Sequence, residues 1–372
     1  MVFTIIIFVI VLGILVFVHE LGHFVMAKKM GMKVEEFGFG FPPKLWGRKG
    51  KDGVMYSINA IPMGGFVKIK GEDFDEKTLA DPDSFSAKKP WQRFVVLIAG
   101  VTMNFLLCAI LLSVGYLIGL PQSVESSVDK NLVRNYKIQV ISLVKDSPAE
   151  KAGVELGDSI VKANGLAINN IDELLKVAAD NVDKAVSFEL KRDDQIITKD
   201  ISPVILSESG KAGIGVGLVE TGIIAYPWYL AIYKGFETTV MLAGAIIVAF
   251  YNVIKSLMLG HGAGMEVSGP VGIAVMTGQV AKLGFIYLLQ FTSLLSLNLA
   301  IINFLPFPAL DGGRLLFILV EKIRRKPINQ KIESIIHTIG FSLLMLLVVV
   351  VTFGDIIRYS GPVVDWWRNL IK

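Results

Sequence analysis

Residues 2–23 read VFTIIIFVIVLGILVFVHELGH, an apolar run that ends in a short polar motif. The run from Val2 to Val18 is long enough to continue as one helix across a bilayer. Residues four apart lie on one face of a helix, so His19 and His23 can present their imidazoles to a single metal ion. Glu20 lies beside the first histidine, where its carboxylate can take a proton from water at that ion. The motif therefore supplies two ligands and a general base within one helical turn.

The alternative is a pair of helix-end histidines facing water beside a solvated glutamate. Ionisable side chains within or beside a membrane-depth helix are costly, and they are a functional hypothesis by default. A catalytic zinc usually has three protein ligands and one open position for water. The motif therefore predicts a third ligand elsewhere in the chain.

The composition is that of a membrane protein. The chain has 372 residues, of which 53% are hydrophobic, and its mean hydropathy is +0.58. These values are too apolar for a soluble globular protein. The net charge of +4 gives no support for nucleic-acid binding. Cys108 is the only cysteine, which excludes an intramolecular disulfide, and its apolar surroundings predict a packing role.

Four stretches meet the length criterion for a spanning helix: Val2–Ala27, Phe94–Leu120, Phe285–Leu305 and Ile335–Ile357. A fifth, Val240–Ile254, is shorter and flanked by charges, so we expect it to lie in the interface or to pack on the bundle. Lysine and arginine concentrate between the first two spans and between the last two. The positive-inside rule makes both connections cytoplasmic and places both termini and the long central segment outside.

The segment after the first span contains alternating runs. Val54–Ile58 and Gly65–Lys70 are predicted as strands, separated by the turn at 61–64. A small membrane-associated sheet is the expected result. It either caps the helix ends or offers an edge strand that pairs with an unfolded substrate backbone.

Residues 123–206 become more polar, and strand-like runs at Ile138–Val144, Val186–Leu190 and Gln195–Ile201 surround a predicted helix at Ile171–Ala179. The stretch SPAEKAGV at 147–154, followed by LGDSIVKANG at 156–165, resembles the core of a PDZ domain of the bacterial protease type. Such a domain either binds a peptide by strand addition or acts as a spacer that restricts access to the membrane site.

Two further histidines are not predicted as ligands. His261 lies in a glycine-rich turn that cannot hold it rigidly, and His337 lies near the start of the last span, where we expect an interfacial position. Ser268–Ile273 is predicted as a turn leading into the third span. In the second span, Gly100 and Asn104 are one turn apart, which favours helix packing, and we expect Asn104 to border the site.

The third span ends in NFLPFPALDGG at 303–313. Two prolines one residue apart cannot continue a regular helix, and breaks at membrane depth are kept where they line a cavity. Asp311 then lies at the cytoplasmic depth of His19 and His23, and its carboxylate is predicted as the third zinc ligand. The alternative is that Asp311 caps a following helix at Arg314–Ile323.

HELGH, the intervening PDZ core and N-x-x-P-x-P-x-L-D-G-G together resemble the site-2 protease family of intramembrane zinc metalloproteases, and within it the bacterial regulator-of-sigma-E proteases. The resemblance implies that Glu20 is catalytic and that His19, His23 and Asp311 hold Zn²⁺. It implies roles in substrate binding or transition-state support for a further set: Asn303, Gly65, Phe66, Val67, Lys68 and Asn104.

The family resemblance also implies partners and a location. The partners are the lipid bilayer and the transmembrane segments of single-span proteins, such as anti-sigma factors and signal-peptide remnants, with a peptide ligand possible at the PDZ groove. The location is the bacterial cytoplasmic (inner) membrane, with the active site near its cytoplasmic side. Some members carry two tandem PDZ domains, whereas this chain has room for one.

The predicted fold is a polytopic α-helical membrane protein with about four transmembrane helices, a small membrane-associated β-sheet and one extracytoplasmic PDZ domain of the α+β class. Its predicted segments are 1–27, 28–93, 94–120, 123–206, 207–283, 284–322, 332–358 and 359–372. Two alternative functions are a membrane-anchored PDZ adaptor with a structural or inactive metal site and a transporter. A transporter should show matched broken helices in repeated halves, and the sequence has one such break.

Overall fold

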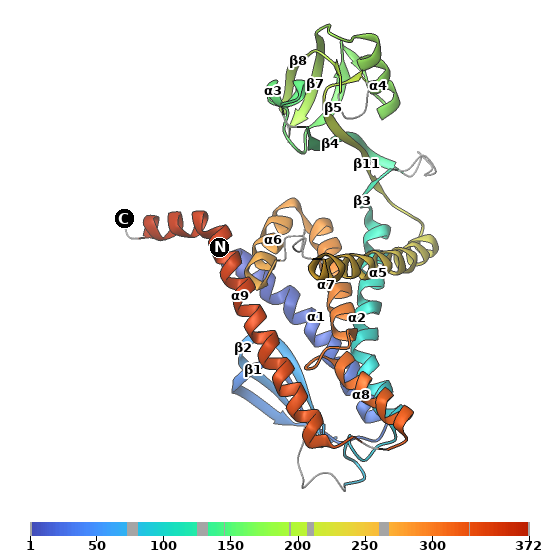
Figure 1. Cartoon of the computed structure of the whole chain (residues 1–372), viewed down its shortest axis with the longest axis vertical. Helices are drawn as coiled ribbons and strands as arrows, with labels where there is room; N and C mark the ends of the chain where they lie inside the picture. The colour runs from blue at the N-terminus through green and yellow to red at the C-terminus, as the bar shows by residue number, and fades with distance from the viewer. Residues whose placement is uncertain are drawn as a thin grey trace. The chain divides into compact units, whose positions relative to one another are not determined.

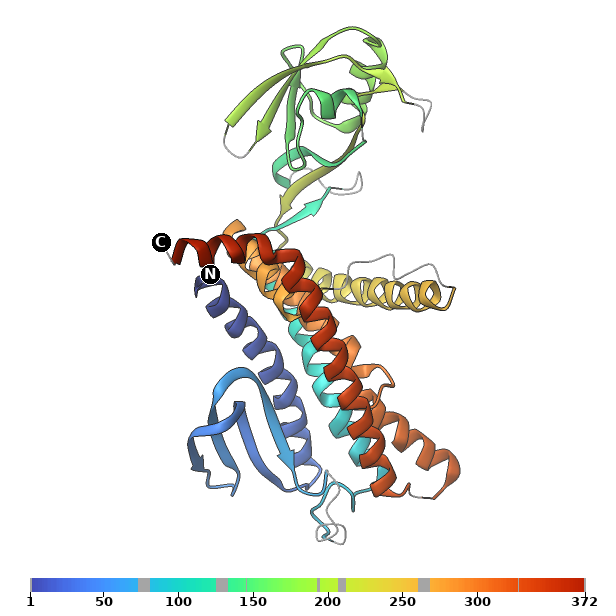
Figure 2. The same cartoon turned by 60° about the vertical axis from the view of Figure 1, so that its left-hand side comes forward.

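The computed structural model describes residues 2–72, 81–124, 133–144, 146–192, 195–206, 212–259, 268–326 and 328–370. It divides into two compact units. The helical unit comprises 1–115 and 232–372, and the α+β unit comprises 116–231. Figures 1 and 2 show the helices and strands of each unit from two directions.

The helical unit is built from seven described helices: α1 (Val2–Lys29), α2 (Pro90–Ile118), α5 (Trp228–Met258), α6 (Pro270–Leu283), α7 (Phe285–Phe304), α8 (Asp311–Arg324) and α9 (Gln330–Leu370). Among the described residues, five helices are long and apolar enough to cross a membrane, namely α1, α2, α7 and most of α5 and α9. The predicted class of a polytopic helical membrane protein is confirmed. Residues after 358, predicted as a separate tail, continue α9 to Leu370.

Helix α5 is longer than predicted. The predicted segment Val240–Ile254 was limited by charges at its ends, but the helix continues through them because Lys234 pairs with Glu237 one turn away, at 2.6 Å. Near its start it packs on α2, where the Thr239 hydroxyl lies 3.6 Å from Cys108 Sγ. By length and composition α5 could span a membrane, so the interfacial position stays a prediction.

Helix α6 replaces the turn predicted at Ser268–Ile273. Proline is favoured in the first turn of a helix, and α6 begins at Pro270. The carboxylate of Asp355 on α9 accepts the Gly272 N–H at 2.7 Å and so caps this helix from outside. At Gly278, α6 lies directly against Thr4 of α1, since an added Cβ would be 2.4 Å from that side chain.

The membrane-associated sheet is confirmed, but its strands differ from the prediction. Both predicted strands belong to one bent strand, β2 (Met55–Ile69), which pairs antiparallel with β1 (Val34–Lys49). The first part of β1 lies between residues 55–58 and residues 65–69 of β2, so the row from Gly65 to Ile69 forms one outer edge. No strand was predicted over β1 because its glycines and prolines interrupt the apolar alternation.

The α+β unit contains one seven-stranded sheet, in which β3 (Leu120–Ser123), β11 (Val216–Ile224), β4 (Val133–Leu143), β5 (Ser159–Ala163), β7 (Val186–Arg192) and β8 (Gln195–Ile201) follow one another and β6 (Leu166–Ala167) pairs with β5. It also has α3 (Pro148–Lys151), α4 (Ile171–Asp180) and a short pair, β9 (Val204–Ile205) with β10 (Ala212–Gly213). Phe188 and Leu190 lie in its core. The predicted end at 206 is too early, because β11 pairs with both β3 and β4.

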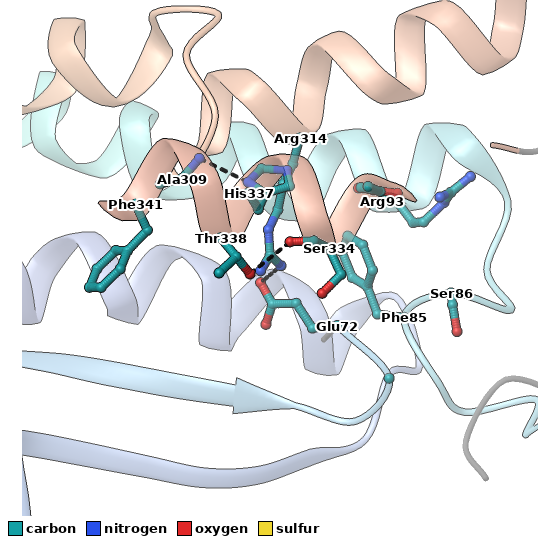
Figure 3. A pocket seen from close by; sticks show the side chains of 12 residues that line it. Glu72, Phe85, Ser86, Arg93, Ala309, Arg314, Ser334, His337, Thr338 and Phe341 are labelled. Carbon is teal, nitrogen blue, oxygen red and sulfur yellow. Dashed lines mark hydrogen bonds and ion pairs between the residues drawn. The ribbon is translucent and has the colours of Figure 1, made fainter. Parts of the chain in front are cut away.

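Helices α8 and α9 border a pocket of about 310 Å³ in the helical unit (Figure 3). Its lining includes Ala309, which precedes α8, and His337 of α9. Glu72, just after β2, forms an ion pair with Arg314 of α8 in this pocket. The pocket therefore adjoins both the end of the edge strand and the loop that leads to Asp311.

Candidate metal centre

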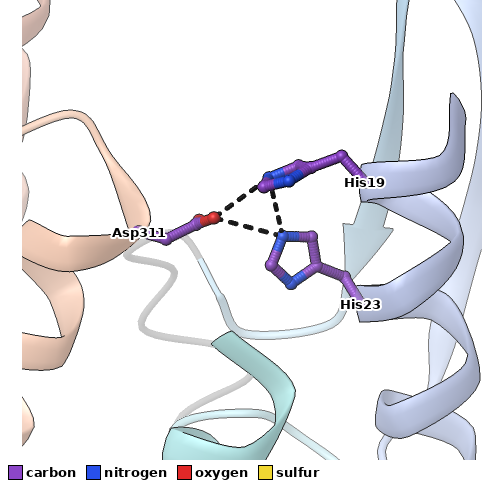
Figure 4. Close-up of side chains that lie close together, drawn as sticks. All are labelled: His19, His23 and Asp311. Carbon is purple, nitrogen blue, oxygen red and sulfur yellow. Dashed lines mark hydrogen bonds and ion pairs between the residues drawn. The ribbon is translucent and has the colours of Figure 1, made fainter. Parts of the chain in front are cut away.

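Three side chains that are far apart in the sequence converge inside the helical unit. His19 and His23 are buried on α1, and their Nε2 atoms are 3.2 Å apart. Asp311 Oδ2 lies 3.0 Å from His19 Nε2 and 3.3 Å from His23 Nε2. Figure 4 shows the carboxylate of α8 pointing at the two rings of α1. All three ligand atoms lie within 4.8 Å of one another, close enough to bind one ion.

The break between α7 and α8 places Asp311. After α7 ends at Phe304, the connecting loop folds so that the first turn of α8 packs against residues 304–308. An added Cβ at Gly312 would lie 2.1 Å from the Leu305 carbonyl oxygen, and one at Gly313 would lie 2.4 Å from that of Phe307. The two glycines after Asp311 are therefore needed for this close approach.

The alternative role of Asp311 as a helix cap is wrong. The N-cap position of α8 is Leu310, and it has no side-chain capping bond. Asp311 is the first helical residue, and its carboxylate is turned toward the histidines.

The hydrogen bonds of the site call for a cation. His23 Nδ1 lies 2.9 Å from the Val96 carbonyl oxygen, which can only accept, so Nδ1 carries the proton. When His23 is neutral, as a metal ligand must be, its Nε2 presents a lone pair toward Asp311 Oδ2, which is also an acceptor. Within the described part of the chain, this buried oxygen has no hydrogen-bond donor. A metal ion would satisfy these converging lone pairs, and two imidazoles with one carboxylate fit zinc.

Glu20 lies next to this centre and is bound to the sheet. Its Oε2 accepts the backbone N–H of Val67 at 3.1 Å. Val67 belongs to the outer edge formed by Gly65–Ile69. Gly65 also faces this carboxylate, since an added Cβ would lie 3.8 Å from Glu20 Cγ. The structure thus brings two of the predicted substrate-facing residues, Gly65 and Val67, to the predicted base.

The other two of the four predicted substrate-facing residues of this strand, Phe66 and Lys68, contact β1. The ring of Phe66 packs against Gly38, where an added Cβ would lie 2.5 Å from it. Lys68 Nζ pairs with Glu35 at 3.0 Å. Phe66 and Lys68 therefore contribute to the sheet rather than to the surroundings of Glu20.

Two asparagines flank His19. Asn104 is fully buried on α2, and its Nδ2 lies 3.4 Å from His19 Nδ1, whereas Asn303 Nδ2 lies 3.3 Å from His19 Nε2. If His19 offers Nε2 to a metal, its Nδ1 carries a proton and needs an acceptor. Asn104 Oδ1 has no hydrogen-bond partner among the described residues, so turning this amide would supply the acceptor. Asn104 thus contacts Nδ1 of the His19 ring, on the side away from the metal position, and Asn303 contacts Nε2, on the metal side.

Sequence reasoning missed how closely α1 and α2 approach. An added Cβ at Gly100 would lie 2.3 Å from His23 Nε2 and 2.8 Å from His19 Cε1. At Gly22 it would lie 2.5 Å from the Ala99 carbonyl oxygen. Gly22 between the two histidines, and Gly100 one turn before Asn104, were the available sequence signals. Val96 gives no such signal, because every residue has a carbonyl.

The two remaining histidines are accounted for separately. His261 lies outside the described residues. His337 is not part of the metal cluster; its Nδ1 lies 2.9 Å from the backbone nitrogen of Ala309.

Comparisons with known proteins find a family, relatives and a solved domain to which this chain is similar. The model of the peptidase family M50 matches residues 7–347. A candidate zinc metalloprotease of Clostridium perfringens is 40% identical over 346 residues, which cover 92% of this chain and 95% of the relative. The regulator of sigma-W protease RasP of Bacillus subtilis is 31% identical over 437 residues, covering 95% of this chain and 98% of the relative. A solved PDZ domain of an SdrC-like protein from Listeria monocytogenes is 25% identical, covers 26% of this chain and 93% of that one, and has a TM-score of 0.21.

Proposed function

This chain belongs to peptidase family M50, the site-2 protease family of zinc metalloproteases, and we propose that it cleaves a peptide bond within the transmembrane segment of single-span proteins. In this proposal His19, His23 and Asp311 hold the zinc ion, and Glu20 is the general base. The observation that carries the proposal is the convergence of two imidazoles and a carboxylate, whose nearest nitrogen and oxygen atoms lie close enough to bind one ion.

The residues around the centre support a hydrolytic mechanism. When bound, zinc supplies a Lewis acid that polarises a carbonyl and makes water a nucleophile at neutral pH. The Glu20 carboxylate takes the proton from the attacking water and delivers it to the leaving amine nitrogen. The Asn303 amide, next to His19 Nε2, is positioned to donate a hydrogen bond to the substrate carbonyl.

The edge strand provides the binding step of the proposal. A transmembrane substrate is helical, so its backbone must unwind before attack, and exposed backbone groups at membrane depth are costly. Pairing with the outer row Gly65–Ile69 would satisfy those groups. A substrate strand bound there would accept the Val67 N–H, and Glu20 would then be free to act on water.

The proposed substrates follow from the similarity to RasP, and the proposed orientation follows from the distribution of charge. RasP of Bacillus subtilis is described as a regulator of sigma-W. By analogy, we propose anti-sigma factors and signal-peptide remnants as substrates here, cleaved near the cytoplasmic side of the bacterial cytoplasmic membrane. If α5 does not span, the positive-inside rule would put both termini and the α+β unit outside. That unit would bind a peptide in its groove or restrict access to the site.

The test is cleavage of a labelled single-span substrate by the full chain reconstituted in lipid vesicles. Glu20→Gln should keep one zinc per chain and lose about 10²- to 10⁴-fold in rate, the usual contribution of a general base. Asp311→Ala should lose both zinc and cleavage. Cleavage at the wild-type rate by Glu20→Gln would refute the proposed mechanism, and a zinc-retaining Asp311→Ala would remove that residue from the ligand set.

A further inference from the structure

The loop between α7 and α8, which ends in the proposed ligand Asp311, is held from outside by α9. Within the loop, short backbone bonds link Phe307 N–H to the Leu305 carbonyl and Leu310 N–H to the Phe307 carbonyl. Such local bonds shape the turn, but they do not tie it to the rest of the bundle. Two residues of α9, His337 and Gly340, provide that connection.

The His337 side chain forms a hydrogen bond with the backbone of the loop. Its Nδ1 accepts the Ala309 N–H at 2.9 Å, and Figure 3 shows this bond at the edge of the pocket. The ring also packs on Phe317 of α8, with ring centroids 5.5 Å apart. One imidazole thus contacts both the residue two before Asp311 and the helix that Asp311 begins.

Ala309 is in a conformation that its surroundings must maintain. Its φ is +80°, in the left-handed region, which residues with a Cβ seldom adopt. Such backbone strain persists only where neighbouring contacts impose it. The bond to His337 maintains this conformation of Ala309. Gly340 packs against the preceding residue, Pro308, since an added Cβ at Gly340 would lie 2.4 Å from Pro308 Cβ.

We propose that His337 is a positioning residue for the metal centre: by fixing Ala309 it sets the direction in which Asp311 points at His19 and His23. The inference rests on the proposed function, because it takes Asp311 to be a zinc ligand. Ligand distances must hold to within about 0.2 Å, and a loop alone holds a side chain less accurately than a helix or strand does. His337 supplies the missing rigidity from α9.

The test is the rate at which full-length purified protein loses zinc to a chelator. The Asn side chain places an acceptor oxygen near the position of His Nδ1, whereas Gln places it near Nε2. His337→Asn should therefore retain zinc nearly as wild type does, while His337→Gln and His337→Leu should lose it about tenfold faster, within the range seen when a metal site loses a supporting group. Ile339→Leu, on an exposed side of α9, is the matched control and should leave the rate unchanged.

A second substitution tests the cause. Glycine adopts positive φ without strain, so Ala309→Gly should recover most of the zinc retention lost in His337→Leu. Equal rates for the Asn and Gln variants, or wild-type retention by His337→Leu, would overturn the inference. If Asp311→Ala loses zinc while His337→Leu keeps it, only this inference fails. If Asp311→Ala keeps zinc, the proposed ligand set fails as well.

Discussion

Gly100→Ala adds one methyl group at the crossing of α1 and α2, and it should disable the metal centre. The new Cβ would lie 2.3 Å from His23 Nε2, 2.7 Å from His23 Cε1 and 2.8 Å from His19 Cε1. Ordinary contact begins near 3.4 Å, so the ring of His23 must retreat by about 1 Å. The His23 ring is also tethered to the Val96 carbonyl, one turn before Gly100 on the same helix, so it cannot retreat without breaking that bond.

The size of the effect follows from two opposing terms. Replacing glycine by alanine inside a helix gains about 0.5–1 kcal/mol, whereas overpacking a well-packed site costs about 1–3 kcal/mol. The cost of overpacking therefore exceeds the gain in helix stability, but a bundle of this size should still fold. The metal site should suffer more, because metal–ligand distances tolerate a deviation of only about 0.2 Å. We expect zinc affinity to fall at least about 100-fold, equivalent to about 2.7 kcal/mol.

The assay is zinc content per chain after equilibration against a graded series of chelator concentrations, together with thermal unfolding. Gly244→Ala on α5 is the matched control, since an added Cβ there meets nothing within 4 Å. The control should keep wild-type zinc affinity and unfold at the same or a slightly higher temperature. The reasoning is refuted if Gly100→Ala binds zinc as tightly as Gly244→Ala does.

Two further predictions concern the edge strand and the α+β unit. Val67→Pro removes the N–H that Glu20 accepts, and because Val67 lies in an edge row the sheet should survive. We expect cleavage to fall with zinc retained, whereas Val67→Ala, which keeps the N–H, should cleave like wild type. Equal activity of the two variants would argue against strand pairing. In the α+β unit, Arg192 donates two hydrogen bonds of 2.8 Å to the buried carboxylate of Asp158 and lowers its pKa. The stabilisation is complete above the unfolded pKa near 3.9 and is lost as pH falls below it, so the protection of the β5 and β7 amides against hydrogen exchange, relative to their intrinsic exchange rate, should fall below about pH 4. Arg192→Gln should show weaker protection at neutral pH and a smaller change of protection with pH, and an unchanged pH dependence of protection would contradict this assignment.

The ligand set could be anticipated because its geometry is intrinsic to short stretches. The spacing of His19 and His23 places them on one helical face in any surroundings, and the pair Pro306 and Pro308 forces a break just before Asp311. Packing between helices is not encoded in this way. Gly100 resembles any small residue at a helix interface, and only the crossing with α1 shows that it faces two imidazoles. The strand β1 was not predicted because its glycines and prolines are atypical of a strand. The structure accommodates them through bulges in its pairing with β2.

Backbone groups explain most of what sequence reasoning could not reach. The Val96 carbonyl orients His23, the Val67 N–H holds Glu20, and the Ala309 N–H ties the Asp311 loop to α9. Every residue except proline offers the same two groups, so side-chain identity at these positions carries no signal. Only the fold shows that each of these groups meets a side chain with proposed chemistry. The sequence thus predicts which groups would do the chemistry, while their orientation depends on backbone contacts that become visible in three dimensions.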